Sequence, residues 1–226
     1  MKLRGLIAAI IMLATVVMLP SHLSAHTPSG ANYAHAWQER TINYYLSNVS
    51  GHPNYWSSIP GLADRIVESM VTWNNAPANF HYNNAGVFDN LDPTCGSQAV
   101  GVNGIFWGPI DGTGPILGWT VDCSYESGRL HSTNITIDGQ ENWYTGTGTP
   151  AANAFDLRSV ATHEFGHGNG MFLAASGANH WNGVSASLCP GNANDQTMCA
   201  NHAAGTTFLR TLASHDSHTF TNRYPQ

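Results

Sequence analysis

The sequence predicts one α+β domain, in which short strands and turns lie between two amphipathic helices. Residues 40–47 (RTINYYLS) alternate apolar and polar side chains, which is typical of a strand. Within 60–74 and 154–168, apolar residues recur at the spacing of one helical face. A last helix is expected over 214–222.

The region between the two long helices is expected to contain short strands separated by clusters of Gly, Asn and Pro. These strands are expected at 79–82, 99–107, 117–124 and 130–138. No internal repeat is visible, so the pattern favours one domain over an array of similar units.

The helix over 154–168 has recognisable start and stop signals. Asn153 is a suitable N-cap, and Asp156 would then lie in the first turn, where the helix dipole favours a negative charge. Gly168 and Gly170 can adopt the left-handed conformation that a helix end requires.

The first 25 residues have the layout of a secretory signal peptide. Lys2 and Arg4 precede an apolar run over 5–19, and small residues lead to a cleavage site after Ala25. A membrane anchor is the weaker alternative, because this run is shorter than the ~20 residues that a spanning helix needs. We therefore expect a secreted, extracellular protein with a single mature domain over 26–226 and no membrane association after the signal is removed.

The charge balance excludes a nucleic-acid partner. Removing the signal peptide leaves six arginines against 14 acidic residues, a net charge of −8 with neutral histidines. A nucleic-acid-binding surface needs clustered basic residues to neutralise phosphates, and this chain has none.

Four cysteines suit an oxidising compartment. They allow three pairings, and their spacing favours Cys95 with Cys123 and Cys189 with Cys199. A cysteine metal site is less favoured because no C-x-x-C pair occurs.

The residues with the clearest chemical meaning lie near the end of the predicted helix 154–168. His163 and His167 are one helical turn apart on the same face, so both can reach one zinc ion at ~2.0–2.1 Å. Glu164 lies beside the first histidine, where it can take a proton from a zinc-bound water that attacks a carbonyl. The motif therefore predicts zinc as cofactor and Glu164 as catalytic base.

Zinc needs a third protein ligand, and elimination narrows the choice. No Glu follows Glu164 in the chain, so a downstream glutamate ligand is excluded. The remaining candidates are residues before the motif or one of His180, His202, His215, His218, Asp195 and Asp216.

Four segments together resemble the metzincin peptidases, most closely the matrixin-like ones. The sharpest is Val160 to Gly170 (VATHEFGHGNG), which looks like their active-site helix. The others are Ile135 to Asp138 with Asn142-Trp143, Thr197-Met198, which resembles the Met-turn beneath the metal, and Arg210 to Asp216 with Tyr224-Pro225. Together they cover most of residues 40–225.

The resemblance implies a metzincin-like fold. It would contain a twisted, mostly parallel β-sheet with an antiparallel edge strand, an N-terminal helix and an active-site helix. An irregular lower subdomain with a Met-turn and a C-terminal helix would follow. The edge strand would be Leu117 to Cys123, and a peptide substrate would pair with it through backbone hydrogen bonds.

The chain departs from this family at the third ligand. The family pattern places a His or Asp three residues after the glycine, where this chain has Leu173. We interpret this as a lengthened loop in which His180 becomes the ligand, because it is the only histidine before the Met-turn candidate. The acidic loops at Asp89 and Asp92 and at Asp111 are compatible with Ca²⁺, but their spacing is not diagnostic and calcium is not predicted.

These observations predict a secreted zinc-dependent endopeptidase that acts on proteins or peptides. A non-catalytic binding protein on the same scaffold is an alternative because of Leu173, and a zinc amidase acting on cell-wall peptides is another. A carbohydrate-binding module, suggested by 7 Trp, would leave Glu164 unexplained. The sequence specifies neither the oligomeric state nor the physiological substrate.

Overall fold

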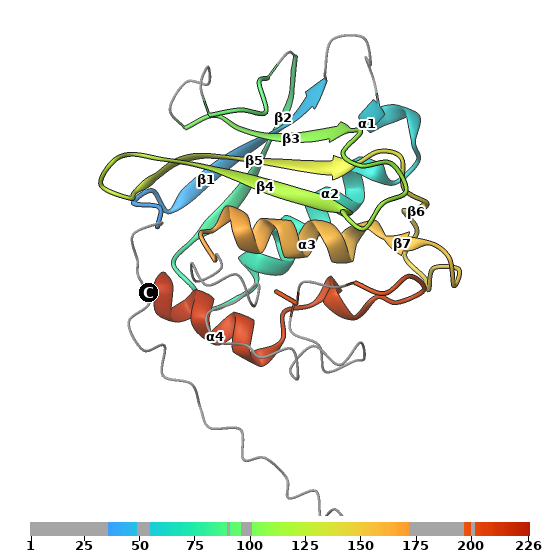
Figure 1. The fold of residues 1–226 in the computed structure, drawn as a ribbon. Helices are drawn as coiled ribbons and strands as arrows, with labels where there is room; N and C mark the ends of the chain where they lie inside the picture. Colours follow the sequence, from blue (N-terminus) through green and yellow to red (C-terminus); the bar gives the residue numbers. More distant parts are fainter. Residues whose placement is uncertain (1–35, 49–54, 90, 96–100, 172–196, 200–201) are drawn as a thin grey trace, which may run out of the picture.

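The computed structural model describes residues 36–48, 55–89, 91–95, 101–171, 197–199 and 202–226 (Figure 1). Its centre is a five-stranded sheet with the strand order β2-β1-β3-β5-β4. The strands are β1 (Thr41–Asn48), β2 (His81–Asp89), β3 (Asn103–Gly108), β4 (Gly118–Ser124) and β5 (Leu130–Asp138). Neighbouring strands run parallel except for β4, which is antiparallel to β5 and forms one edge of the sheet.

The helices complete a mixed α/β architecture. The α-helices of the described residues are α1 (Tyr55–Ser58), α2 (Leu62–Asn74), α3 (Leu157–Gly168) and α4 (Ser214–Arg223). The remaining elements are a 3-10 turn, η3 (Phe208–Arg210), and a small parallel pair, β6 (Trp143–Tyr144) with β7 (Phe155–Asp156). Helices α2 and α3 lie side by side under the same face of the sheet, and α4 lies on the far side of α3 from the sheet (Figure 1).

This arrangement confirms the coarse prediction of an α+β domain with a mostly parallel sheet. Several element boundaries differ from those expected. Strand β2 continues to Asp89 instead of ending at 82, and the first long helix begins at Leu62. The later start follows from Gly61, whose φ of 78° is left-handed and cannot belong to the helix.

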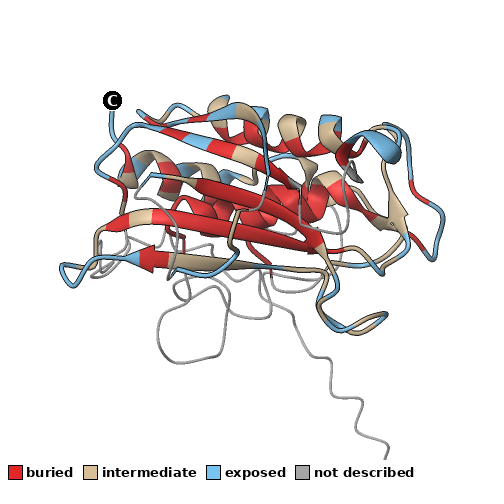
Figure 2. Cartoon of the chain, turned by 90° about the horizontal axis from the view of Figure 1, so that it is seen from above, coloured by how far each residue is buried: buried red, intermediate tan, exposed pale blue. Residues whose placement is uncertain are grey.

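The core lies between the sheet and its two covering helices. Helix α2 buries Leu62, Ile66, Met70 and Trp73, a spacing that places them on one face. The central strands are buried along most of their length, which Figure 2 shows from above. Helix α3 is unusual because all but one of its 12 residues are buried. Its polar side chains are therefore held inside the protein and need partners there.

The predicted start of the second long helix, expected over 154–168, was wrong. Helix α3 begins at Leu157, and Asp156, expected in the first turn, is itself the N-cap whose Oδ1 accepts the Ser159 N–H (2.8 Å). The residue before it, Phe155, belongs with Asp156 to β7, which pairs with β6 and keeps the chain extended up to the cap. Asn153 is therefore too far upstream to cap the helix.

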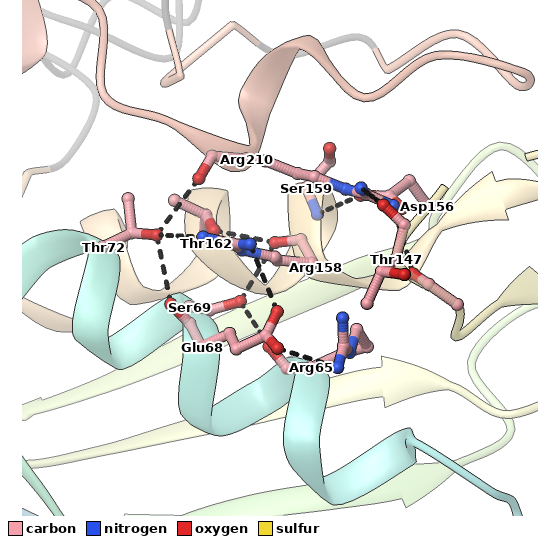
Figure 3. A network of polar contacts seen from close by, with 11 residues as sticks. Arg65, Glu68, Ser69, Thr72, Thr147, Asp156, Arg158, Ser159, Thr162 and Arg210 are labelled. Carbon is pink, nitrogen blue, oxygen red and sulfur yellow. Dashed lines mark hydrogen bonds and ion pairs between the residues drawn. The ribbon is translucent and has the colours of Figure 1, made fainter. Parts of the chain in front are cut away.

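A polar network fixes this end of α3 to the elements around it (Figure 3). Arg210 donates through Nε to Asp156 Oδ1 (2.9 Å) and through Nη2 to Oδ2 (2.5 Å), so the buried cap carboxylate is paired at both oxygens. Glu68 of α2 bridges Arg65 (2.7 Å) and Arg158 (3.2 Å), which joins the two helices. The first turn of α3 is thus held from both sides.

The predicted disulfide between Cys95 and Cys123 is present, with the two Cα atoms 5.3 Å apart. Cys199 is also disulfide-bonded, and its expected partner, Cys189, lies outside the described residues. Within the described ranges, no helix is long and apolar enough to cross a membrane.

Candidate metal centre

Helix α3 brings the imidazoles of His163 and His167 together. Their Nε2 atoms are 3.1 Å apart and their ring planes are nearly perpendicular, at 86°. Two nitrogen ligands of one tetrahedral zinc ion, each at 2.0–2.1 Å, would be about 3.3–3.4 Å apart. The pair therefore has close to the separation that a shared metal requires.

Backbone carbonyls fix which nitrogen of each ring faces the other. Nδ1–H of His163 donates to the carbonyl of Thr197 (2.8 Å), and Nδ1–H of His167 donates to the carbonyl of Met171 (2.9 Å). A carbonyl can only accept, so in the neutral rings both Nε2 atoms are unprotonated and carry lone pairs on the sides of the rings that face each other. Two such lone pairs at 3.1 Å repel unless both nitrogens share a cation, which can be a metal ion or a proton. The residues present therefore fit a metal ion, with both ligand orientations fixed by second hydrogen bonds.

Glu164 lies between the two histidines in sequence and faces the edge strand. Thr120 of β4 donates its hydroxyl to Glu164 Oε2 (2.7 Å), and the side chain passes close to Gly118, where a Cβ would be 3.3 Å from Oε1. Burial raises the pKa of the Glu164 carboxyl to about 7, although the hydrogen bond from Thr120 lowers it. A carboxyl with such a pKa can both accept and return a proton near neutral pH.

The end of α3 that carries His167 is held by three aromatic side chains from distant parts of the chain. The hydroxyl of Tyr82 donates to the Phe165 carbonyl (2.5 Å) and the indole N–H of Trp37 to the Gly168 carbonyl (2.8 Å). The hydroxyl of Tyr224 donates to the Asn169 carbonyl (2.6 Å). Helix ends leave carbonyls without intrahelical partners, and the donors from Trp37 and Tyr224 satisfy two such groups, whereas the Phe165 carbonyl also accepts the Asn169 N–H (3.0 Å).

Met198, which the sequence analysis placed in a Met-turn, packs directly against α3. A Cβ at Gly166 would lie 2.1 Å from the Met198 sulfur, so only glycine at this position allows the approach. The preceding residue, Thr197, donates its backbone N–H to Asp216 Oδ2 (2.5 Å). Asp216 is fully buried, and this burial raises the pKa of its carboxyl to about 6.

The described residues do not supply a third metal ligand next to His163 and His167. No group of three or more His, Cys, Asp or Glu side chains in the described ranges is arranged to hold a metal. His180, our predicted ligand, and Asp195 lie outside those ranges. Asp216 is turned toward Thr197, and His218 is exposed on α4 beside Asn222. His215 lies on α4 as well, and its side chain is not described.

A cavity of about 430 Å³ opens beside His163 and Glu164. The loop before β4 and the middle of α3 form its walls, and Cys199 and His202 close it from the segment after Met198. Its lining residues are Gly114, Pro115, Ile116, Leu117, Gly118, Phe155, Val160, His163, Glu164, Cys199 and His202. The reactive groups thus border a space large enough for a bulky side chain.

Two groups of site residues could not be predicted from the motif. One is Thr120, and the other is the set of aromatic side chains that donate hydrogen bonds to the end of α3. All of them contact residues far away in the sequence, and no local sequence pattern marks a single Thr, Tyr or Trp for such a contact. The edge position of β4, by contrast, agrees with the strand that we expected to bind substrate.

The loops considered for calcium hold their carboxylates with local donors. Asp92 accepts the N–H of Thr94 (2.7 Å), and Asp111 accepts the N–H of Ile116 (3.3 Å). These contacts explain why acidic residues occur in the turns without requiring an ion.

No protein-family model matches the chain.

Proposed function

We propose that this chain is an exported zinc-dependent endopeptidase of the metzincin type. His163, His167 and His180 would hold the metal, and Glu164 would act as the catalytic base. The observation that supports this most directly is the facing pair of Nε2 atoms at 3.1 Å, each oriented by a carbonyl on its own Nδ1. No other described cluster offers nitrogen ligands in this arrangement.

The protein's own groups would divide the work of hydrolysis. When bound, zinc would supply Lewis-acid chemistry, polarising a carbonyl and making water more acidic. Glu164 Oε2 is engaged by Thr120, which leaves Oε1 to take a proton from the attacking water. The same carboxyl would then deliver the proton to the departing amine. Burial of the site excludes bulk water and strengthens each of these interactions.

Peptides would bind along β4, the strand at the sheet edge next to Glu164. An extended chain can add to such an edge through backbone hydrogen bonds, while one side chain enters the cavity beside His163. Proteins or peptides are therefore the proposed substrates, and the extracellular space is the proposed location, since residues 1–25 resemble a signal peptide.

The test uses purified protein from residue 26 onward, with casein and quenched fluorescent peptides as substrates. We expect about one zinc per chain and cleavage that a chelator stops and added zinc restores. Glu164→Gln should keep the zinc and lose ~10²–10⁴-fold in kcat. Glu126→Gln, at an exposed position in the turn after β4, is the matched control and should behave as wild type. Cleavage that continues without metal would refute the mechanism.

A separate experiment assigns the third ligand. His180→Ala should lose zinc under dialysis, whereas His202→Ala should keep it and alter only the cavity. If His202→Ala loses zinc and His180→Ala does not, the assignment moves to His202.

The alternative of a non-catalytic binding protein is favoured by one observation, Leu173 at the usual ligand position. It predicts weak zinc binding and no cleavage, so the same zinc measurement separates it from the peptidase. An amidase would cleave cell-wall peptides but not casein.

A further inference from the structure

Apolar side chains are concentrated on the edge strand. Six large hydrophobic residues are exposed in the described part of the chain, and three of them, Ile116, Trp119 and Tyr125, lie on β4 or just beside it. Trp119 is 50% exposed in the middle of the three. A half-exposed tryptophan beside a reaction centre requires an explanation, because tryptophan is costly to leave in water.

Alternate residues of β4 form hydrogen bonds with β5, and this alternation shows which backbone groups of β4 point away from β5. The N–H of Asp138 bonds to the carbonyl of Leu117 (3.0 Å), and the register places Trp119 opposite Thr136. In an antiparallel ladder, bonded pairs alternate, so odd-numbered residues of β4 bond to β5. The N–H and C=O of Gly118 and Thr120 therefore point away from β5, and within the described ranges no strand pairs with them.

The side chains of β4 alternate between the two faces of the sheet. Thr120 reaches Glu164 with its hydroxyl, and Gly118 lies against the same carboxylate, so even-numbered residues face α3. Trp119 must then project from the opposite, outer face. The reaction centre and the tryptophan are thus on opposite faces of one strand.

We propose that Trp119 is a specificity-determining residue that contacts a large apolar side chain of the bound peptide on the outer face of the sheet. This inference rests on the proposed peptidase function. A peptide that pairs with Gly118 and Thr120 places one residue opposite Trp119, and cross-strand Cβ atoms are then ~4.5–5.5 Å apart. The peptide's side chains alternate too, so residues that point at the cavity are flanked by residues that point at Trp119.

The chemistry of the outer face favours an aromatic or branched aliphatic partner. On that face, the register places Thr136 opposite Trp119, and the alternation of β4 places Val121 two residues along the strand. None of these is charged. Tryptophan also loses little conformational entropy on binding, which makes it effective as a contact residue.

The test compares peptides that differ only by Phe or Ala at one position, scanned across the residues on both sides of the cleaved bond. Wild type should prefer Phe at one or more positions that alternate with the residue in the cavity. Trp119→Ala should reduce this preference, the ratio of the two kcat/KM values, by roughly 3- to 10-fold. Trp119→Phe should retain part of it. Phe88→Ala removes a similarly exposed aromatic from β2 at the opposite edge and should leave every ratio unchanged.

A second measurement is independent of catalysis. Labelled Phe and Ala peptides are titrated into Glu164→Gln protein with and without the Trp119→Ala change, and affinity is read by fluorescence polarisation. Equal effects on both peptides would overturn the role of Trp119 while leaving the peptidase proposal in place. If the Phe peptide binds more tightly than the Ala peptide and this difference depends on Trp119, but the wild-type protein cleaves nothing, the contact with Trp119 is supported and the proposed peptidase function is contradicted. A wild-type protein that neither cleaves nor binds peptides contradicts both.

Discussion

Replacing Gly166 by alanine tests the contact between the metal-site helix and Met198. The new Cβ would lie 2.1 Å from the Met198 sulfur and 2.9 Å from Cζ2 of Trp73, both closer than atoms can pack. Met198 and Trp73 are buried, with 1% and 0% of their surface exposed, so neither can move aside into solvent. Alanine must therefore displace the turn or the helix.

The magnitude follows from two opposing effects. Overpacking of a filled core costs typically ~1–3 kcal/mol, while Gly→Ala within a helix gains ~1 kcal/mol in backbone propensity. With two clashes at one atom, we expect the upper end of the packing cost and a net loss of about 2 kcal/mol in the free energy of unfolding.

A double-mutant cycle separates the clash from other effects. Met198→Ala alone should cost ~2–5 kcal/mol through lost burial and a cavity. That cavity accepts the alanine methyl group, so the two changes together should cost ~1–3 kcal/mol less than their sum. The free energy of unfolding is measured by urea denaturation of disulfide-intact protein in the presence of a chelator, so that metal does not contribute. Additive costs would show that Met198 does not pack on Gly166 of α3.

Three further changes test the supports of the site. Arg210→Met leaves the Asp156 carboxylate buried without its ion pair and should cost ~3–5 kcal/mol in urea denaturation; a loss below 1 kcal/mol would contradict the buried pair. Asp216 has a folded pKa of about 6 against the ordinary 3.8. Because the folded state holds this proton more tightly, its contribution to stability falls as pH rises from about 4 to about 6. Asp216→Asn should flatten that part of the pH–stability curve, and an unchanged slope would argue against the shift. Tyr82→Phe removes one donor from the Phe165 carbonyl and should cost ~0.5–1.5 kcal/mol and weaken zinc binding in a chelator competition; stability loss with unchanged zinc affinity would limit Tyr82 to folding.

The parts of the candidate site that could be predicted depend on the regular spacing of residues along a helix or a strand. His163 and His167 converge because residues four apart share a helix face, and this follows from helix geometry alone. Strand β5 matches its expected bounds of 130–138 because its apolar pattern is confined by turns on both sides. The edge position expected for Leu117 to Cys123 agrees with β4, although it was inferred from a resemblance and not from the strand's own pattern.

The parts that could not be predicted depend on residues far apart in the chain. The start of α3 is set by Asp156, whose partner Arg210 is 54 positions away. The contact between Thr120 and Glu164 spans 44 positions and requires knowing that β4 lies over α3. Neither separation leaves a periodic signal, because each contact is made by tertiary packing and not by a repeating local pattern.

The two Nδ1 hydrogen bonds of the histidine pair have a consequence for how the chain around the site can vary. Met171 and Thr197, the acceptors, are the residues that flank positions 172–196, so each imidazole is tied to one end of that stretch. The span between its ends is therefore set by one turn of α3 and not by the stretch itself. Both acceptors are backbone carbonyls, so the orientation of the two imidazoles depends on the path of the main chain at 171 and 197 and not on the side chains at these positions.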